Sequence, residues 1–587
     1  MNYNLSKPAG QKDQKKSVWT GLRQMLGLMT GERKILILAF VFIMINASLS
    51  LLAPVLIGYT IDHYVQTKLY HGVLVFSGIL LGMYLITLVT SYLQTKLMGT
   101  VGQRLLFNLR NALFNKLQEL PVDFFNQNRA GDLISRINND TDKINQFFSQ
   151  SLVQFLSSIV VMTGAAIFLL SINLPLGAAA LSPAIFIWFI TKAISPWVKA
   201  RNALSMKNAG NLSAEIQESL NNFKVIIAFN RRDYFRKRFE EVNNENYSSA
   251  VKAGIANNTF MPVYGLFSNF GQLIVLAFGI YLIAAGQFSI GLLISFLAYI
   301  NNFYNPLRQL AALWANLQVA LAGWDRISQI LSLETNLLVI EDPKTEISTS
   351  LMSFKNVTFS YCYGKEVLHK VSFDLEKGKT YAFVGPTGGG KTTTASLIAR
   401  LYDATKGAIL LDGKDIRTYN AEERSDKVGF ILQEPFLFTG TVRDNIIYGN
   451  KHFNDVSNEK LLKALDETGL KNLIERFDKG LDTQIETTGD GISLGQKQII
   501  AFMRAVLRNP QLIILDEATA NIDTVTEKLL EEIMRKLPVS TTRVIIAHRL
   551  NTIENADEIY FVNSGNVTRA GSLNDAVKLL LNEKLES

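Results

Sequence analysis

The chain has 587 residues, a hydrophobic share of 48% and a formal net charge of +8. This length exceeds one ordinary hydrophobic core, so several domains are expected. The positive charge does not indicate a nucleic-acid partner, because basic residues and aromatics are not interleaved in a base-reading module. The single cysteine, Cys362, excludes an internal disulfide framework and is expected to be a small buried hydrophobe.

Residues 1–34 form a basic stretch that precedes the first long apolar segment. Their basic residues are Lys7, Lys12, Lys15, Lys16, Arg23, Arg33 and Lys34. The positive-inside rule places this stretch in the cytoplasm. Its segment SVWTGLRQMLGLM (17–29) is amphipathic and predicts a helix on the membrane surface. No signal peptide is expected, since the apolar block that follows is too long for an h-region.

Long stretches without Asp, Glu, Lys or Arg predict membrane-spanning helices. Four such stretches occur, at 35–61, 69–95, 144–191 and 253–307. A span needs about 20 mainly apolar residues, so the first two stretches hold one span each and the last two hold two each. The six expected spans are 35–61, 70–97, 152–172, 174–195, 260–284 and 289–312. Buried core helices would explain only shorter runs of about 10 to 14 residues.

The connections between these spans predict the orientation of a transmembrane domain at residues 35–332. Two long, charged connections, 96–143 and 192–252, fall on the same side as the basic N-terminus. Within them, segments 121–140 and 218–233 have helical patterns with one apolar and one charged face. Each is either an amphipathic helix packed on its own loop or a docking surface for another domain.

After a linker at residues 333–350, residues 351–587 have the short apolar strands and glycine turns of an α/β domain. The segment GPTGGGKT (385–392) fits the P-loop pattern and stands between a predicted strand and helix. Its glycines let backbone N–H groups converge on phosphate oxygens, and the helix N-terminus favours negative charge. Lys391 is expected to reach the β- and γ-phosphates of ATP, and the Thr392 hydroxyl to ligate Mg²⁺.

Two further predicted strands end in polar residues. The strand in QLIILDEATANID is followed by Asp516 and Glu517, and the strand in VIIAHRL leads to His548. Beside a P-loop, Asp516 is expected to hold the Mg²⁺ shell, Glu517 to orient and deprotonate the attacking water, and His548 to contact the γ-phosphate. Without a P-loop, the two acids would suggest a solvated turn, and the histidine an ordinary strand end.

These motifs, in this order, resemble those of an ABC exporter half-transporter over nearly the whole chain. The resemblance implies a membrane protein in which a six-helix all-α transmembrane domain precedes an α/β P-loop ATPase domain. It also implies that segments 121–140 and 218–233 are coupling helices, which pass domain motion to the spans. The expected location is the cell membrane, with the N-terminus and the ATPase domain in the cytoplasm.

The resemblance assigns roles residue by residue. Tyr361 in VTFSY stacks on adenine, and Gln433 in FILQEPFLF senses Mg²⁺ and the attacking water. Asp523 in ANID belongs to the D-loop, and His548 is the switch histidine. The catalytic set is therefore Glu517, His548 and Gln433, and the metal set is Thr392, Gln433 and Asp516. The remaining ATP contacts are Gly385, Pro386, Thr387, Gly388, Gly389, Gly390, Thr393, and the signature residues Ser493, Gly495 and Gln496.

In this family two nucleotide domains close head to tail around two ATP molecules, so one chain requires a second half-transporter. The signature segment ISLGQ has Leu494 where the family has glycine. A side chain there forfeits glycine's conformational freedom and crowds the phosphate. Together with an intact hydrolytic set, this resembles the catalytic-glutamate subunit of heterodimeric multidrug exporters. A homodimer remains the alternative, as does a leucine that points away from the nucleotide.

The spans carry aromatic and amide side chains and almost no charge. These residues are Tyr84, Tyr264, Phe267, Asn269, Gln272, Tyr299, Asn301, Asn302 and Tyr304. They suit a cavity for hydrophobic or amphipathic small molecules, as in the multidrug exporters, but they also serve helix packing. A lipid flippase or a peptide exporter shares the layout, although no peptidase domain is apparent. The six spans oppose a soluble nucleic-acid motor, and the fused domain order opposes an importer.

Overall fold

The computed structural model describes residues 3–5, 18–27, 30–334, 337–341, 349–361, 364–453, 456–486, 491–516, 528, 530, 532–535, 537–546, 556–571, 575 and 578. The chain divides into two compact units. The helical unit comprises Asp13–Leu117 and Gly131–Ser332, and the sheet unit comprises Met1–Lys12, Gln118–Ala130 and Leu333–Ser587. Segment 118–130 of the first long connection therefore belongs with the sheets rather than with the spans.

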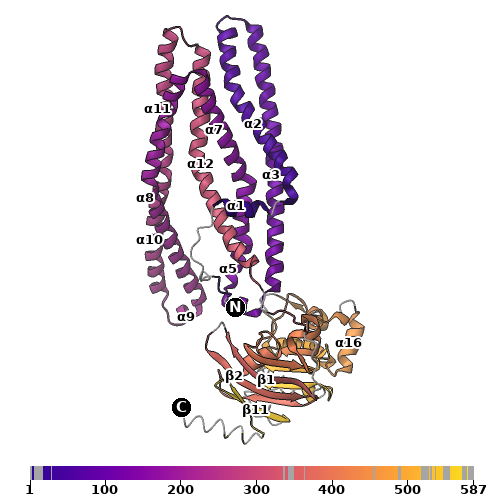
Figure 1. Ribbon diagram of the computed structural model, residues 1–587. Coiled ribbons are helices and arrows are strands. Elements are labelled where there is room, and N and C mark those ends of the chain that lie inside the picture. The colour runs from indigo at the N-terminus through magenta and orange to yellow at the C-terminus, as the bar shows by residue number, and fades with distance from the viewer. Residues whose placement is uncertain are drawn as a thin grey trace. The chain divides into compact units, whose positions relative to one another are not determined.

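Long helices that lie side by side build the helical unit (Figure 1). Several extend well past a membrane's apolar thickness, because α3 has 50 residues, α8 has 48 and α12 has 42. The helices are α1 (Val18–Gly27), α2 (Arg33–Thr60), α3 (Tyr70–Glu119), α5 (Ala130–Ser135), α6 (Thr141–Gln146), α7 (Leu152–Ile172), α8 (Leu174–Asn221), α9 (Phe223–Ala228), α10 (Arg232–Asn258), α11 (Phe260–Ala284) and α12 (Ile290–Leu331). The π-helical stretches Ile61–Val65, Arg136–Asp140 and Phe147–Ser151 continue α2, α5 and α6.

Among the described residues, five helical stretches are long and apolar enough to cross a membrane. They are Arg33–Val65, Tyr70–Glu119, Ala130–Ile172, Leu174–Asn221 and Arg232–Ala284. The sixth predicted span coincides with the first half of α12, whose amides Asn301, Asn302 and Asn305 make it less apolar. The helical character of this unit agrees with the expectation, whereas the count of six spans stays a prediction.

Several aromatics that the sequence offered for a cargo cavity instead pack the helices together. Tyr264, Tyr299 and Tyr304 are buried in the apolar cluster that α7, α8, α11 and α12 share. The Tyr299 hydroxyl donates to the Leu51 carbonyl on α2, and that of Tyr304 donates to the Ala180 carbonyl on α8 at 2.9 Å. Each hydroxyl thus satisfies a buried donor while its ring fills the core.

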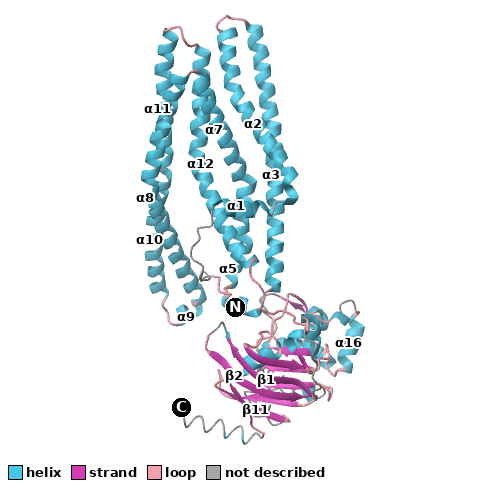
Figure 2. Ribbon diagram, in the orientation of Figure 1, coloured by secondary structure: helices cyan, strands magenta, loops and turns pink. Residues whose placement is uncertain are grey.

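The sheet unit contains two main sheets, drawn in magenta in Figure 2. Among the described strands, the first sheet is antiparallel, with the order β2-β1-β4-β5. The second has the order β12-β11-β3-β10-β9-β6, with parallel pairing from β11 to β6. The strands are β1 (Ser350–Ser360), β2 (Glu366–Glu376), β3 (Thr380–Val384), β4 (Lys406–Leu411), β5 (Lys414–Asp415), β6 (Val428–Ile431), β9 (Leu512–Asp516), β10 (Thr542–Ile546), β11 (Glu558–Asn563) and β12 (Asn566–Arg569).

The sheet unit has a sheet layer and a helical layer, and each layer is built around a large apolar core. One core lies between the two sheets and includes α13 (Lys391–Ile398). The other joins β6 and β9 to the helices α15 (Val442–Ile447), α16 (Asn458–Glu467) and α17 (Leu494–Val506). Strands β3 and β9 are buried along their whole length, and β10 alternates between buried and half-buried residues, as parallel strands covered on both faces do. Their carboxyl ends therefore share one edge of the sheet, where ligands bind in open α/β folds.

Candidate nucleotide-binding site

The P-loop follows the central strand β3 and turns directly into α13. Gly385 has φ +145° and Gly390 has φ +116°, which are conformations that L side chains rarely adopt. A Cβ on Gly385 would overlap the Val562 carbonyl oxygen of β11. The loop therefore needs glycine for the backbone turn and for its close approach to the neighbouring strand. This geometry leaves the first N–H groups of an eight-residue helix without intrahelical partners, as phosphate binding requires.

Lys391 is the first residue of α13, and its side chain folds back over the loop. Its Nζ donates to the carbonyl oxygens of Gly385 at 2.9 Å and Pro386 at 3.0 Å, and the residue is 5% exposed. A buried ammonium held by carbonyl dipoles is a positive charge fixed beside the loop's N–H groups. This arrangement provides an electrostatically favourable cradle for a polyphosphate.

Thr392 and Asp516 meet although 124 positions separate them in the chain. The Thr392 hydroxyl donates to Asp516 Oδ1 at 3.5 Å, and Asp516 is the last, buried residue of β9. A hydroxyl and a carboxylate oxygen side by side are the ligand types that Mg²⁺ prefers. The donor set therefore fits the expected metal.

The strands that precede the other expected catalytic residues end at this same edge. Asp516 of β9 pairs with Ile546 of β10, and Ile546 pairs with Phe383 of β3. The expected catalytic and D-loop residues Glu517, His548 and Asp523 lie outside the described residues.

Tyr361 follows β1 and lies beside α13. Its hydroxyl is 3.0 Å from Thr393 Oγ1, and its ring makes edge contacts with Phe359 and Tyr402. Burial raises the pKa of the Tyr361 phenol above its ordinary value. With about a third of its surface exposed, Tyr361 offers a fixed aromatic surface next to the P-loop helix.

The signature segment lies on the helical layer rather than on the P-loop layer. Ser493 caps α17 in a capping box: its hydroxyl accepts from Gln496 N at 3.2 Å, and its own N–H donates to Gln496 Oε1 at 2.9 Å. Gln496 also donates to the Arg476 carbonyl at 2.8 Å, and Gly495 is buried. Because α17 packs against α15 and β6, while α13 packs against β9, the two motifs belong to different layers of one domain.

Leu494 does not strain the backbone, contrary to the expectation that a side chain here forfeits a conformational freedom that only glycine has. It is the first residue of α17, so its backbone is helical and has no need of glycine's freedom. Its side chain is half-buried and packs against the apolar core of the helical layer. The substitution thus adds a Cβ and an isobutyl group at the helix N-terminus, and that group points at least partly into the protein.

Gln433 follows β6, and two residues of α17 hold its loop. Gln433 is exposed, and its backbone carbonyl accepts from Gln498 Nε2 at 2.8 Å. Arg504 donates to the carbonyls of Phe436 at 3.2 Å and Asn445 at 2.7 Å. The Gln433 loop and the signature helix are therefore tied at two points. Sequence reasoning missed Gln498 and Arg504, because no pattern in a helix says which carbonyl a side chain will reach.

Only residues 121–130 of the first expected coupling segment belong to the sheet unit, whereas residues 131–140 belong to the helical unit. Helix α4 (Val122–Gln127) buries Phe124 completely and Asp123 almost completely. Its Asn126 Nδ2 donates to the Tyr402 hydroxyl at 2.6 Å, and the Tyr402 ring contacts Tyr361. A chain of contacts thus runs from α4 to the residue expected to stack on adenine.

The second expected coupling segment contains α9, which belongs to the helical unit. Only its Ile226 is buried, whereas Phe223, Val225 and Ile227 are 55%, 54% and 42% exposed. Phe229, just beyond the helix, is 75% exposed. This short helix therefore presents a cluster of apolar side chains to its surroundings.

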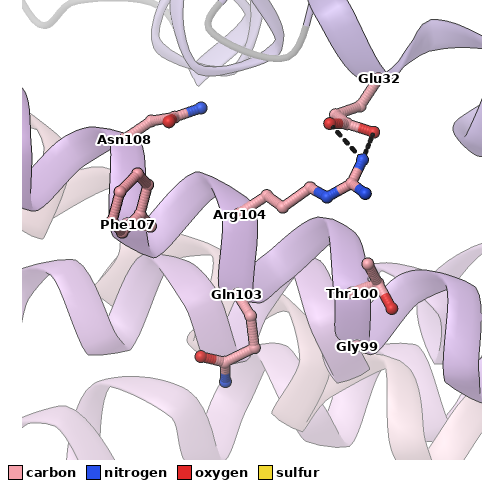
Figure 3. A pocket seen from close by; sticks show the side chains of 7 residues that line it. All are labelled: Glu32, Gly99, Thr100, Gln103, Arg104, Phe107 and Asn108. Carbon is pink, nitrogen blue, oxygen red and sulfur yellow. Dashed lines mark hydrogen bonds and ion pairs between the residues drawn. The ribbon is translucent and has the colours of Figure 1, made fainter.

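A hollow in the helical unit lies between Glu32 and the α3 residues 99–108 (Figure 3). Arg104 Nη1 donates to both carboxylate oxygens of Glu32, at 2.9 and 3.0 Å. The two charged groups in this hollow therefore neutralise each other. Its residues belong to none of the nucleotide motifs.

Comparison with known proteins identifies both parts of the chain. Residues 36–307 match the ABC transporter transmembrane region, and residues 368–520 match the ABC transporter ATP-binding family. An uncharacterized ABC transporter ATP-binding protein of Bacillus subtilis, YfiC, is 35% identical over 98% of this chain and 95% of its own length. A multidrug resistance ABC transporter ATP-binding and permease protein of Lactococcus lactis is 30% identical, over 85% and 84% of the two chains. A fatty acid ABC transporter ATP-binding/permease protein of Mycobacterium bovis is 32% identical, over 84% and 77%.

A solved structure confirms the fold. The chain superimposes on a bacterial Atm1-family ABC exporter with ATP bound, with a TM-score of 0.76 and 24% identity, over 94% of this chain and 96% of that one. The matched families also account for the P-loop, the apolar helices and their order along the chain. The protein belongs to the ABC transporters that fuse a membrane-spanning region to an ATP-binding domain, and it is an ATPase coupled to transport across a membrane.

Proposed function

We propose that this chain is one half of a dimeric ABC exporter that moves hydrophobic or amphipathic small molecules out across the cell membrane. The observation that carries the proposal is the convergence of Lys391, Thr392 and Asp516 at one sheet edge, in a chain that also contributes long apolar helices. The N-terminus and the ATPase domain lie in the cytoplasm under the positive-inside rule. Residues 35–332, with six spans, form the transmembrane domain, and residues 351–587 form the nucleotide domain.

Hydrolysis in this proposal uses the residues at the carboxyl edge of the parallel sheet. Lys391 and the P-loop N–H groups bind the β- and γ-phosphates, and Tyr361 stacks on adenine. Thr392, Asp516 and Gln433 would hold Mg²⁺, which neutralises charge on the transferring phosphoryl group. Glu517 orients the attacking water and accepts its proton, and His548 contacts the γ-phosphate.

The second half of each ATP site comes from a partner subunit. The P-loop and the signature stand on different layers of one domain, and one chain holds one copy of each. Two head-to-tail domains supply two complete sites, each with the P-loop of one subunit and the signature of the other. The exposed apolar side chains of α9 are the surface that docks on the partner's nucleotide domain, as α4 docks on its own.

We further propose that the partner is a different half-transporter. Leu494 adds bulk at a helix N-terminus that meets the partner's nucleotide, whereas this chain keeps Lys391, Asp516 and Glu517. The site formed with this signature holds ATP, and the site formed with this P-loop hydrolyses it. Because the backbone at Leu494 is helical, the effect of the leucine comes from its added bulk near the phosphate and not from backbone strain.

The proposal of a multidrug cargo is supported by the similarity to the relative from Lactococcus lactis and by the low charge of the spans. The fatty acid relative from Mycobacterium bovis favours a second candidate, a lipid-like acyl substrate. These cargoes differ in charge, because lipophilic drugs are often cations while fatty acids are anions at neutral pH. The structure leaves Tyr84 56% exposed on α3, which keeps it among the candidate cargo contacts.

The test uses the complex purified from its host and reconstituted in liposomes. We expect ATP-driven movement of a cationic dye such as ethidium, with a labelled fatty acid as the competing substrate. Lys391→Ala should abolish ATP binding, while Glu517→Gln should keep ATP binding and lose most hydrolysis, because only the base is removed. Transport of the fatty acid alone would replace the multidrug cargo, and near-normal hydrolysis by Glu517→Gln would refute the base.

A further inference from the structure

Residues 3–5, near the start of the chain, lie against α4 and the residue that follows it. The Tyr3 N–H donates to Gln127 Oε1 at 2.9 Å, and the Leu5 N–H donates to Asn128 Oδ1 at 3.0 Å. Asn128 Nδ2 in turn donates to the Tyr3 carbonyl at 2.9 Å and to the Phe124 carbonyl at 2.8 Å. The side-chain amides of Gln127 and Asn128 thus bond to the backbone N–H and C=O groups of this segment, as the backbone of a neighbouring β-strand would.

The Tyr3 side chain fixes the same residues to α4 by a second type of contact. The residue is only 1% exposed, and its ring meets the Phe124 ring edge-on, with centroids 6.3 Å apart and an interplanar angle of 87°. Phe124 itself is fully buried. An aromatic pair of this geometry adds to the stabilisation from area burial alone.

The Tyr3 hydroxyl reaches a third segment, the linker that follows α12. It donates to the Glu334 carbonyl at 3.0 Å, a contact that spans 331 positions of the chain. The same linker is held further along, where Arg400 Nη2 donates to the Leu338 carbonyl at 2.8 Å and the Ile340 N–H donates to the Arg417 carbonyl at 3.1 Å. Tyr3 therefore joins α4 to the beginning of a linker whose later part is bound to the nucleotide domain.

Ordering a residue costs conformational entropy, which specific contacts must offset. A fully buried tyrosine with both its backbone groups and its hydroxyl bonded is therefore a built contact. Its bonds go to the end of α4, including Asn128, and to the linker, and both segments lie close in the chain to long helices of the helical unit. A contact at that position bears on how motion passes between the domains.

We propose that residues 3–5 form a strap that fastens α4 to the beginning of the linker, so that both follow the nucleotide domain together when ATP binds. Tyr3 is a positioning residue in this account, because it acts through α4 and Glu334. The inference rests on the proposed function only in assuming that ATP drives a change in the membrane-spanning helices. It does not depend on the cargo or on the identity of the partner.

The test measures hydrogen exchange in the assembled, detergent-solubilised transporter, with and without ATP and vanadate, and compares four proteins. Tyr3→Ala removes the ring and the hydroxyl, whereas Tyr3→Phe keeps the ring on Phe124 and loses only the bond to Glu334. Tyr247→Ala is the matched control, since that tyrosine is 69% exposed on α10. The readouts are the exchange of α4 and the linker, the ATP-induced change at the turn 285–289 between α11 and α12, and the ATPase rate.

In Tyr3→Ala we expect the α4 and linker amides to exchange about 25-fold faster, because two side-chain contacts worth roughly fivefold each are lost. The ATP-induced change at the turn 285–289 should fall at least about twofold, while ATPase stays within about twofold of the parent. Tyr3→Phe should loosen the linker but not α4, and Tyr247→Ala should match the parent.

Three results would overturn the strap. They are unchanged exchange of α4 in Tyr3→Ala, an unchanged ATP response at the turn, or an equal fall in ATPase and response, which indicates general destabilisation. Absence of any ATP response in the parent protein would instead contradict the proposed transport cycle. Because no cargo is added, the result for the strap does not depend on what the protein transports.

Discussion

The helices α4 and α9 are each six residues long and occupy corresponding positions in the two long connections, yet their surroundings differ. Helix α4 buries Phe124 and bonds to Tyr402 of its own nucleotide domain. Helix α9 leaves Phe223, Val225 and Ile227 largely exposed. Helix α4 therefore packs within the sheet unit, whereas α9 presents apolar side chains that its own helical unit leaves uncovered.

This difference supports the proposal that the chain works together with a second half-transporter. Clustered, exposed apolar side chains mark interaction surfaces in soluble regions of proteins. In the proposed dimer, the second half-transporter would supply a second nucleotide domain on which α9 could dock. In the proposed dimer, the partner therefore both completes the ATP sites and covers the apolar side chains of α9.

The largest expected effect on transport comes from a charge in the α9 cluster. Phe223→Asp should reduce ATP-driven transport at least about tenfold, because an unpaired carboxylate in an apolar interface costs several kcal/mol. Thermal stability of the subunit itself should change little, since exposed substitutions usually stay within about 0.5 kcal/mol. Dye transport and thermal unfolding measure the two. Met206→Asp, at a residue that is 78% exposed on α8, is the control, and equal effects of both variants would remove α9 as a docking surface.

The next prediction concerns how much the buried side chain of α4 contributes to the stability of the sheet unit. Phe124→Ala should destabilise the sheet unit by about 3 to 5 kcal/mol, because it empties a fully buried aromatic position. The adjacent Phe125 is 44% exposed, so Phe125→Ala provides a matched control with a much smaller effect. Thermal unfolding of the two variants under the same conditions shows whether the Phe124 variant is the less stable one. A Phe124 variant as stable as the Phe125 variant would mean that α4 is not anchored in this unit.

A smaller effect is expected for the hydrogen bond between Asn126 and Tyr402. Tyr402→Phe and Asn126→Ala should each cost about 1 kcal/mol, roughly a fivefold change in an equilibrium. In a double-mutant cycle the combined variant should lose little more than either single one, because both remove the same bond. Stability or transport rate can serve as the readout. Fully additive losses would show that the two side chains act separately.

The sequence predicted the meeting of Thr392 and Asp516 better than the packing of the aromatics in the spans. A P-loop must follow a strand and open a helix, and acids at the end of a parallel strand must reach the same edge, so the meeting of Thr392 and Asp516 followed from the pattern. In contrast, every side of a membrane helix is apolar, so periodicity does not say which residues face a neighbour. Tyr299 and Tyr304 therefore looked equally suited to a cavity and to the core, where the structure places them.

Long-range contacts through single side chains were also beyond the sequence. The place of segment 118–130 in the sheet unit and the bonds of Tyr3 depend on how distant segments meet. For Leu494, the family pattern indicated a departure from glycine. Only the structure shows that the position is helical and that the side chain packs partly inward.

The smallest expected effect concerns Leu494. If its signature serves the site that holds ATP, Leu494→Gly should change the hydrolysis rate of the complex by less than about twofold, because the other site carries turnover. Steady-state ATPase of the purified complex measures this change. A gain of tenfold or more would point to two equally impaired sites, as a homodimer would have.

Composition of the intact complex tests the central claim most directly. The tagged chain, extracted from its host in mild detergent, can be weighed by native mass spectrometry. The account predicts the 65.5 kDa of this chain plus one different half-transporter. Twice the mass of this chain would place Leu494 in both sites and contradict the heterodimer.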